Sequence, residues 1–219
     1  MMNHIARTGA LVAALALLCA PMSWAQTAAP QAAAPAAKPV GMMPPAQAGL
    51  MATAQVAGQT LKLNGKGVRY RTLVKVYEIG LYVASPTNSL EQFLAAPGAK
   101  RLQLITLREL TGDTLGVAMV QGMQDNAPAA ERVKLLTYMN QLAKIFGEEP
   151  AVAPGSVLTI DFVPGRGTVL TLNGAQKGSV ITDPIFFPAA ARIWLGPKPV
   201  DFTLKDALLG NAVKHPESG

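Results

Sequence analysis

The chain has 219 residues, with 19 lysines and arginines against 13 aspartates and glutamates, which gives a formal net charge of +6 at pH 7. The basic residues are dispersed and are not interleaved with aromatic residues, so the composition disfavours nucleic-acid binding. Cys19 is the only cysteine, and the two histidines are His4 and His215, so we expect no disulfide, no histidine-dependent catalysis, no metal site and no cofactor.

The N-terminal residues 1–25 have the pattern of a secretory signal peptide. Arg7 precedes an apolar run over residues 10–20, and Ser-Trp-Ala ends at Ala25. The run is too short to span a membrane. A lipoprotein signal at Cys19 is the alternative, but Leu18 stands where lipidation favours a small residue. We therefore expect a periplasmic or secreted protein without a transmembrane segment, with weak contact to anionic membrane surfaces left open.

Three further segments follow the signal peptide. Residues 26–54 are rich in alanine and proline and are predicted to form a flexible spacer. Residues 55–211 are one domain's worth of chain, and residues 212–219 form a polar tail.

The first half of the domain reads as strands. Asn64-Gly65 predicts a hairpin turn, and the Val- and Tyr-rich residues 65–84 predict one long strand, followed by another over residues 100–109. Side chains two apart on a strand share a face, so Arg69 and Tyr77 should point to the same side. Periodicity alone favours a solvated face for Arg69.

The second half begins with helices and returns to strands. Residues 111–126 and 128–146 predict two helices, and Leu115, Met119 and Met123 recur at four-residue spacing, either as plain core or as an adaptable pocket lining. Strands follow over residues 156–172 with a hairpin at Asn173-Gly174, and a short helix over residues 183–196 comes next. This order predicts an α+β fold with helices layered on one face of an antiparallel sheet.

Four segments in this order resemble the chalcone isomerase superfamily, and in particular its secreted bacterial chalcone isomerase-like branch, over residues 57–210. They are GKGVR at 65–69, KVYEIGLYV at 75–83, KRLQLITLRELTG at 100–112 and NGAQKGSVITDPIFFPAAARIWLG at 173–196. The resemblance implies an open-faced β-sandwich, with a ligand cleft between the long antiparallel sheet and the helices.

The resemblance also implies roles for individual residues. Arg69 falls on the arginine that stabilises the developing enolate in plant chalcone isomerases. The other catalytic positions of the plant enzymes fall on residues of different chemistry: Tyr77, Leu115, Ala118, Gly122 and Ile193. A tyrosine at the position of Tyr77 is similar instead to the fatty-acid-binding branch, in which an arginine and a tyrosine hold the carboxylate of the ligand.

Three hypotheses follow. The first is an exported, non-catalytic domain that binds a small apolar acid such as a fatty acid, with Arg69, Tyr77, Leu115 and Met119 as ligand-binding residues. The second is an intramolecular lyase or isomerase that acts on a chalcone-like enone with Arg69 as its catalytic residue. The third is an envelope accessory or scaffold protein without a small ligand. The sequence identifies no protein partner.

Overall fold

The computed structural model describes residues 49–212. The predicted signal peptide, most of the predicted spacer and the tail from residue 213 lie outside the described residues. The first strand begins at Thr53, two residues before the predicted start of the domain.

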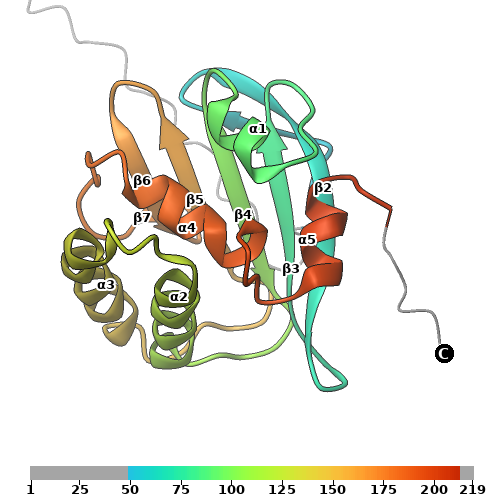
Figure 1. The fold of residues 1–219 in the computed structure, drawn as a ribbon. Helices are drawn as coiled ribbons and strands as arrows, with labels where there is room; N and C mark the ends of the chain where they lie inside the picture. The colour runs from blue at the N-terminus through green and yellow to red at the C-terminus, as the bar shows by residue number, and fades with distance from the viewer. Residues whose placement is uncertain (1–48, 213–219) are drawn as a thin grey trace, which may run out of the picture. The chain divides into compact units, whose positions relative to one another are not determined.

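Seven strands form one antiparallel sheet in which each strand pairs with the next along the chain. The sheet is curled, and its strands follow one another across Figure 1. They are β1 (Thr53–Val56), β2 (Gln59–Arg71), β3 (Val74–Val83), β4 (Lys100–Thr106), β5 (Val157–Val163), β6 (Gly167–Leu172) and β7 (Ala175–Gln176).

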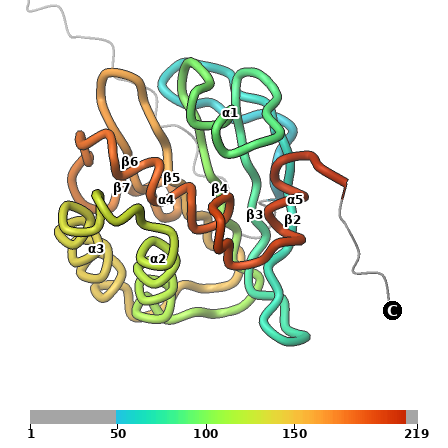
Figure 2. The backbone as a smooth tube through the Cα atoms, in the orientation of Figure 1, coloured from blue at the N-terminus to red at the C-terminus, as the bar shows by residue number. Residues whose placement is uncertain are grey.

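All five helices lie on the same face of the sheet (Figures 1 and 2). They are α1 (Leu90–Ala95), α2 (Gly112–Asn126), α3 (Arg132–Gly147), α4 (Phe186–Leu195) and α5 (Phe202–Leu208). Helix α2 packs against α3 and α4, and α5 packs against β2. This arrangement confirms the predicted α+β fold, with helices layered on one face of an antiparallel sheet.

The main core lies between the sheet and the helices. Alternate residues of the central strands point into it, including Ile79 and Leu81 on β3 and Leu102 and Leu104 on β4. A smaller apolar cluster around Tyr82 lies on the other side of the sheet. No helix of the described residues is long and apolar enough to cross a membrane.

The prediction of one strand over residues 65–84 was wrong. The chain turns back at Thr72 and Leu73, and residues 59–71 and 74–83 form the two arms of a hairpin. A turn here carries none of the usual glycine, proline or asparagine signals, and Thr72 adopts a positive φ of 57°.

The predicted hairpin at Asn64-Gly65 was also wrong, because β2 continues through it with a bulge. Helix α5 explains this local sequence. The amide of Asn64 donates hydrogen bonds to the carbonyls of Thr87 (2.9 Å) and Leu208 (2.8 Å). A Cβ at Gly65 would lie 2.1 Å from the carbonyl oxygen of Ala207, so only glycine allows the helix to come this close. The second predicted hairpin, at Asn173-Gly174, was correct: both residues have positive φ, as a tight turn between β6 and β7 requires.

Candidate functional site

The site begins with a pair of residues on neighbouring strands. Arg69 on β2 is the direct antiparallel partner of Tyr77 on β3, and partners in this register project from the same face of a sheet. A bulge between Arg69 and Tyr70 sets this pairing, because it shifts the register of β2 by one residue. The two residues therefore share a face, as predicted, although they do so across a hairpin and not along one strand.

Arg69 lies on the helix-covered face and is only partly exposed. Its Nη1 donates to a carboxylate oxygen of Asp201 at 3.2 Å and to the carbonyl of Tyr70 at 2.6 Å. The side chains of Arg69 and Asp201 are 28% and 24% exposed. Nε and Nη2 make no hydrogen bond within the described part of the chain. The guanidinium thus keeps donors for a further acceptor while one carboxylate holds it in place.

Asp201 also caps the helix that follows it. Its other carboxylate oxygen accepts from the backbone N–H of Leu204 at 3.1 Å and caps the N-terminus of α5. The two oxygens of one carboxylate thus hold both Arg69 and the start of α5.

Tyr77 is held from the side of α4. The indole Nε1 of Trp194 donates a hydrogen bond of 2.9 Å to the hydroxyl oxygen of Tyr77. Burial raises the pKa of Tyr77 to about 12, and this outweighs the opposing effects of the Trp194 hydrogen bond and the Arg69 charge. The residue is therefore a neutral phenol, and its own O–H donates to no acceptor among residues 49–212.

Leu115 and Met119 belong to the main core. Both are buried on α2, and Met119 is packed in the same cluster as Met123 and Phe187. Two of the positions where the plant enzymes carry polar side chains pack directly on one another: a Cβ at Gly122 would lie 2.8 Å from the side chain of Ile193. The contact between α2 and α4 is therefore apolar at these two positions.

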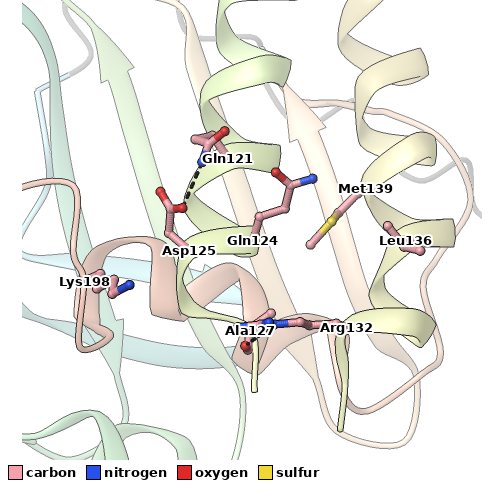
Figure 3. Close-up of a pocket in the computed structure, with 8 residues that line it drawn as sticks. All are labelled: Gln121, Gln124, Asp125, Ala127, Arg132, Leu136, Met139 and Lys198. Carbon is pink, nitrogen blue, oxygen red and sulfur yellow. Dashed lines mark hydrogen bonds between the residues drawn. The ribbon is translucent and has the colours of Figure 1, made fainter. Parts of the chain in front are cut away.

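Five surface hollows of the described domain lie elsewhere and include neither Arg69 nor Tyr77. Figure 3 shows one of about 390 Å³ beside the end of α2, where Gln121 donates to Asp125 at 2.9 Å. Its other lining residues include Gln124, Arg132 and Lys198. No group of three or more His, Cys, Asp or Glu residues that could hold a metal occurs in residues 49–212.

Sequence reasoning missed two members of the site, Trp194 and Asp201. They contact residues that are 117 and 132 positions away along the chain, so no local pattern could connect them with Tyr77 and Arg69. The segment that contains Trp194 was part of the family resemblance, and this is the only signal that could have pointed to it.

A family model described as chalcone isomerase-like matches residues 45–210, which is most of the chain. The chain belongs to the chalcone isomerase-like family. A crystal structure of a fatty-acid binding protein from Arabidopsis thaliana matches with a TM-score of 0.52 and 15% sequence identity, and the match covers 74% of this chain and 97% of that one. At this identity the likeness concerns the fold. No curated protein sequence matches the chain.

Proposed function

We propose that this chalcone isomerase-like domain is an exported, non-catalytic protein that binds a small apolar carboxylate such as a fatty acid. The observation that carries the proposal is the pairing of Arg69 with Tyr77 on the helix-covered face. The pair offers guanidinium N–H groups and one phenolic O–H, which are the donors that a carboxylate needs.

The apolar tail would extend from this pair along the core face of the sheet. Tyr77, Ile79 and Leu81 alternate along β3 on that face, and α2 adds Leu115 and Met119 to the same core. Methionine side chains adapt their shape readily, so the core can make room by moving Met119. Burying a long acyl chain contributes about 0.8 kcal/mol per CH₂ before ordering costs, which exceeds the contribution of the head group.

The residues at the remaining positions of the plant enzymes support binding without catalysis. Leu115 has no group that could polarise a carbonyl or hold a water. Gly122 and Ile193 pack together, so neither position carries a polar side chain. Arg69 alone would be left to stabilise an enolate, and its Nη1 already faces the carboxylate of Asp201.

The comparisons support the same proposal. The domain has the fold of an Arabidopsis protein that is described as binding fatty acids. Export to the periplasm or outside the cell is proposed from the sequence pattern of residues 1–25 alone.

Titration of the purified protein with decanoate tests the head-group site, with decanol as the uncharged control ligand. We expect Arg69→Met and Tyr77→Phe to weaken decanoate binding by about tenfold to a hundredfold, because each removes hydrogen bonds to a charged group. Decanol binding should change little. Arg71→Met, two residues along the same strand and exposed, is the matched control. Equal decanoate affinity for the wild type and Arg69→Met would refute the proposed clamp.

A ligand-free accessory protein is the second candidate function. The observation in its favour is that Met119, Met123 and Phe187 already fill the space between sheet and helices. Mass spectrometry of lipids extracted from the purified protein separates the two candidates. A retained apolar acid supports the first, and a protein that retains none and binds no decanoate supports the second.

A further inference from the structure

The tip of the β2–β3 hairpin projects beyond the rest of the described domain (Figures 1 and 2). Its turn residues are Thr72 and Leu73. Leu73 is 90% exposed, the largest value among the exposed large hydrophobic residues of this part of the chain. A leucine at the end of a projecting hairpin contributes nothing to the core and is free to contact a partner outside the domain, and such a contact is indicated where further apolar residues lie beside it.

Apolar residues gather around Leu73. Tyr70 and Val74 flank it on the two arms of the hairpin, and both are about half exposed. Leu107, just after β4, lies beside the same hairpin arm: its N–H donates to the carbonyl of Val76 at 2.9 Å, and its side chain is 41% exposed. We call this patch, together with the exposed cations Arg71, Lys75 and Arg108, the tip surface.

The charge of the tip surface is positive. None of its three cations takes part in any of the five ion pairs of the described residues. The hairpin residues 70–76 contain two basic side chains, Arg71 and Lys75, and no acidic one. A surface of this kind, apolar with cations around it, suits the interface of an anionic bilayer. Its apolar side chains can enter the acyl region while its cations contact the anionic head groups.

We propose that the tip surface docks on an anionic lipid bilayer. A second copy of the chain fits this surface poorly, because a two-fold contact would bring two positively charged tip surfaces together. A neutral protein surface could contact the apolar residues but would offer no anionic groups to the three cations.

Docking in this way would bring the candidate site to the membrane. Arg69 lies two residues before Arg71 on β2, and the exposed Phe202 follows Asp201, the ion-pair partner of Arg69. If the proposed function holds, an apolar acid passes between the bilayer and the Arg69–Tyr77 pair without crossing bulk water. Membrane docking itself does not depend on that ligand.

Co-sedimentation of the full chain with vesicles tests the proposal. Vesicles of equal parts phosphatidylcholine and phosphatidylglycerol are compared with pure phosphatidylcholine. We expect the protein to bind the anionic vesicles preferentially and to be released by salt. Leu73→Ser should lower the partition coefficient by about tenfold, and Arg71→Gln with Lys75→Gln by about tenfold or more. Val133→Ser with Lys134→Gln is the matched control, because Val133 on α3 is 78% exposed and Lys134 is an exposed cation.

Each outcome decides the question. Absence of binding to anionic vesicles, or equal losses in the tip and control variants, overturns the proposal. So does a wild-type dimer that ignores vesicles and dissociates on Leu73→Ser, since the tip surface would then be a contact between copies. Vesicle binding is measured without any added apolar acid, so a failure of the ligand proposal leaves this test intact. Circular dichroism and thermal unfolding confirm that each variant is folded.

Discussion

The indole nitrogen of Trp194 on α4 donates a hydrogen bond of 2.9 Å to the hydroxyl oxygen of Tyr77 on β3. This contact joins the helix layer to the sheet at the point where Arg69 approaches Tyr77 from β2. The phenol is therefore held by an indole on one side and lies beside a guanidinium on the other. Its ionisation consequently reports on the integrity of the whole site.

Alkaline pH should destabilise the fold through Tyr77. Its pKa rises from the ordinary 10.0 to about 12 in the folded state, chiefly because of burial. The unfolded chain then loses the proton first, so the free energy of unfolding falls as the pH rises from 10.0 to about 12. In denaturant unfolding across this range, Tyr77 should account for a loss on the order of 2 kcal/mol.

In Tyr77→Phe the free energy of unfolding should fall less steeply with rising pH, because phenylalanine has no proton to lose. Tyr82 has a similarly raised pKa of about 12, again chiefly from burial, so some of the fall remains in the variant. Tyr70→Phe, at an exposed tyrosine, controls for the loss of a phenol. An unchanged profile in Tyr77→Phe would show that its hydroxyl is solvated in the folded protein.

Asp201 should show separable effects on stability and on ligand affinity. Asp201→Ala removes both the cap of α5 and the ion pair with Arg69, and we expect a loss of about 1 to 2 kcal/mol in the free energy of unfolding. Asp201→Asn keeps a capping oxygen and removes only the charge, so its loss should be about 0.5 kcal/mol.

The same substitution should improve carboxylate binding. In Asp201→Asn the Arg69 guanidinium no longer faces a competing carboxylate, so decanoate should bind roughly fivefold more tightly, which corresponds to the upper range of a partly exposed ion pair. Calorimetric titration measures this change, and decanol again serves as the uncharged control. A weaker affinity for decanoate would mean that Asp201 positions Arg69 for the ligand and does not compete with it.

The fold class could be predicted because it depends on local patterns and their order. Strands with apolar alternation enclose two amphipathic helices, and this order alone indicates a layered α+β domain. The turn at Thr72-Leu73 could not be predicted, since a β-branched residue at positive φ is uncommon and gives no turn signal. The hairpin predicted at Asn64-Gly65 was wrong because these two residues are determined by a tertiary contact, the packing of α5 against β2.

The candidate site could be predicted only in part. Arg69 and Tyr77 were expected on one face, and the register places them directly opposite each other. That result depends on the bulge beside Tyr70, without which Arg69 would face Val76. No spacing in the sequence encodes this bulge. Trp194 and Asp201 reach the site from the last third of the chain, so only the folded arrangement reveals them.

Substitution of Gly65 should separate α5 from the sheet. A Cβ at this position would lie 2.1 Å from the carbonyl oxygen of Ala207 and 2.5 Å from that of Leu208. Backbone atoms cannot yield as a flexible side chain can, so Gly65→Ala should cost about 2 to 3 kcal/mol of unfolding free energy. Gly49→Ala is the matched control, because its Cβ would have no neighbour within 4 Å. Equal stability of the two variants would show that α5 is not held against β2.

Replacement of Lys100 should stabilise the protein. Lys100 is only 3% exposed, and its Nζ lies 4.9 Å from the centre of the Phe162 ring. It forms none of the ion pairs found in the described domain. Burial lowers the pKa of this lysine, so the charged ammonium costs stability at neutral pH and the cation–π contact offsets only part of that cost.

Lys100→Met keeps the shape of the side chain and removes the charge. We expect a gain of about 1 kcal/mol in the free energy of unfolding at neutral pH. Because the folded pKa lies below the ordinary 10.5, the unfolded chain binds the proton more strongly, and the wild type recovers stability as the pH rises toward that value. The advantage of Lys100→Met should therefore shrink at alkaline pH. Lys134→Met, at an exposed lysine of α3, should show no comparable gain, and a Lys100→Met protein less stable than the wild type would mean that the ammonium is stabilised where it lies.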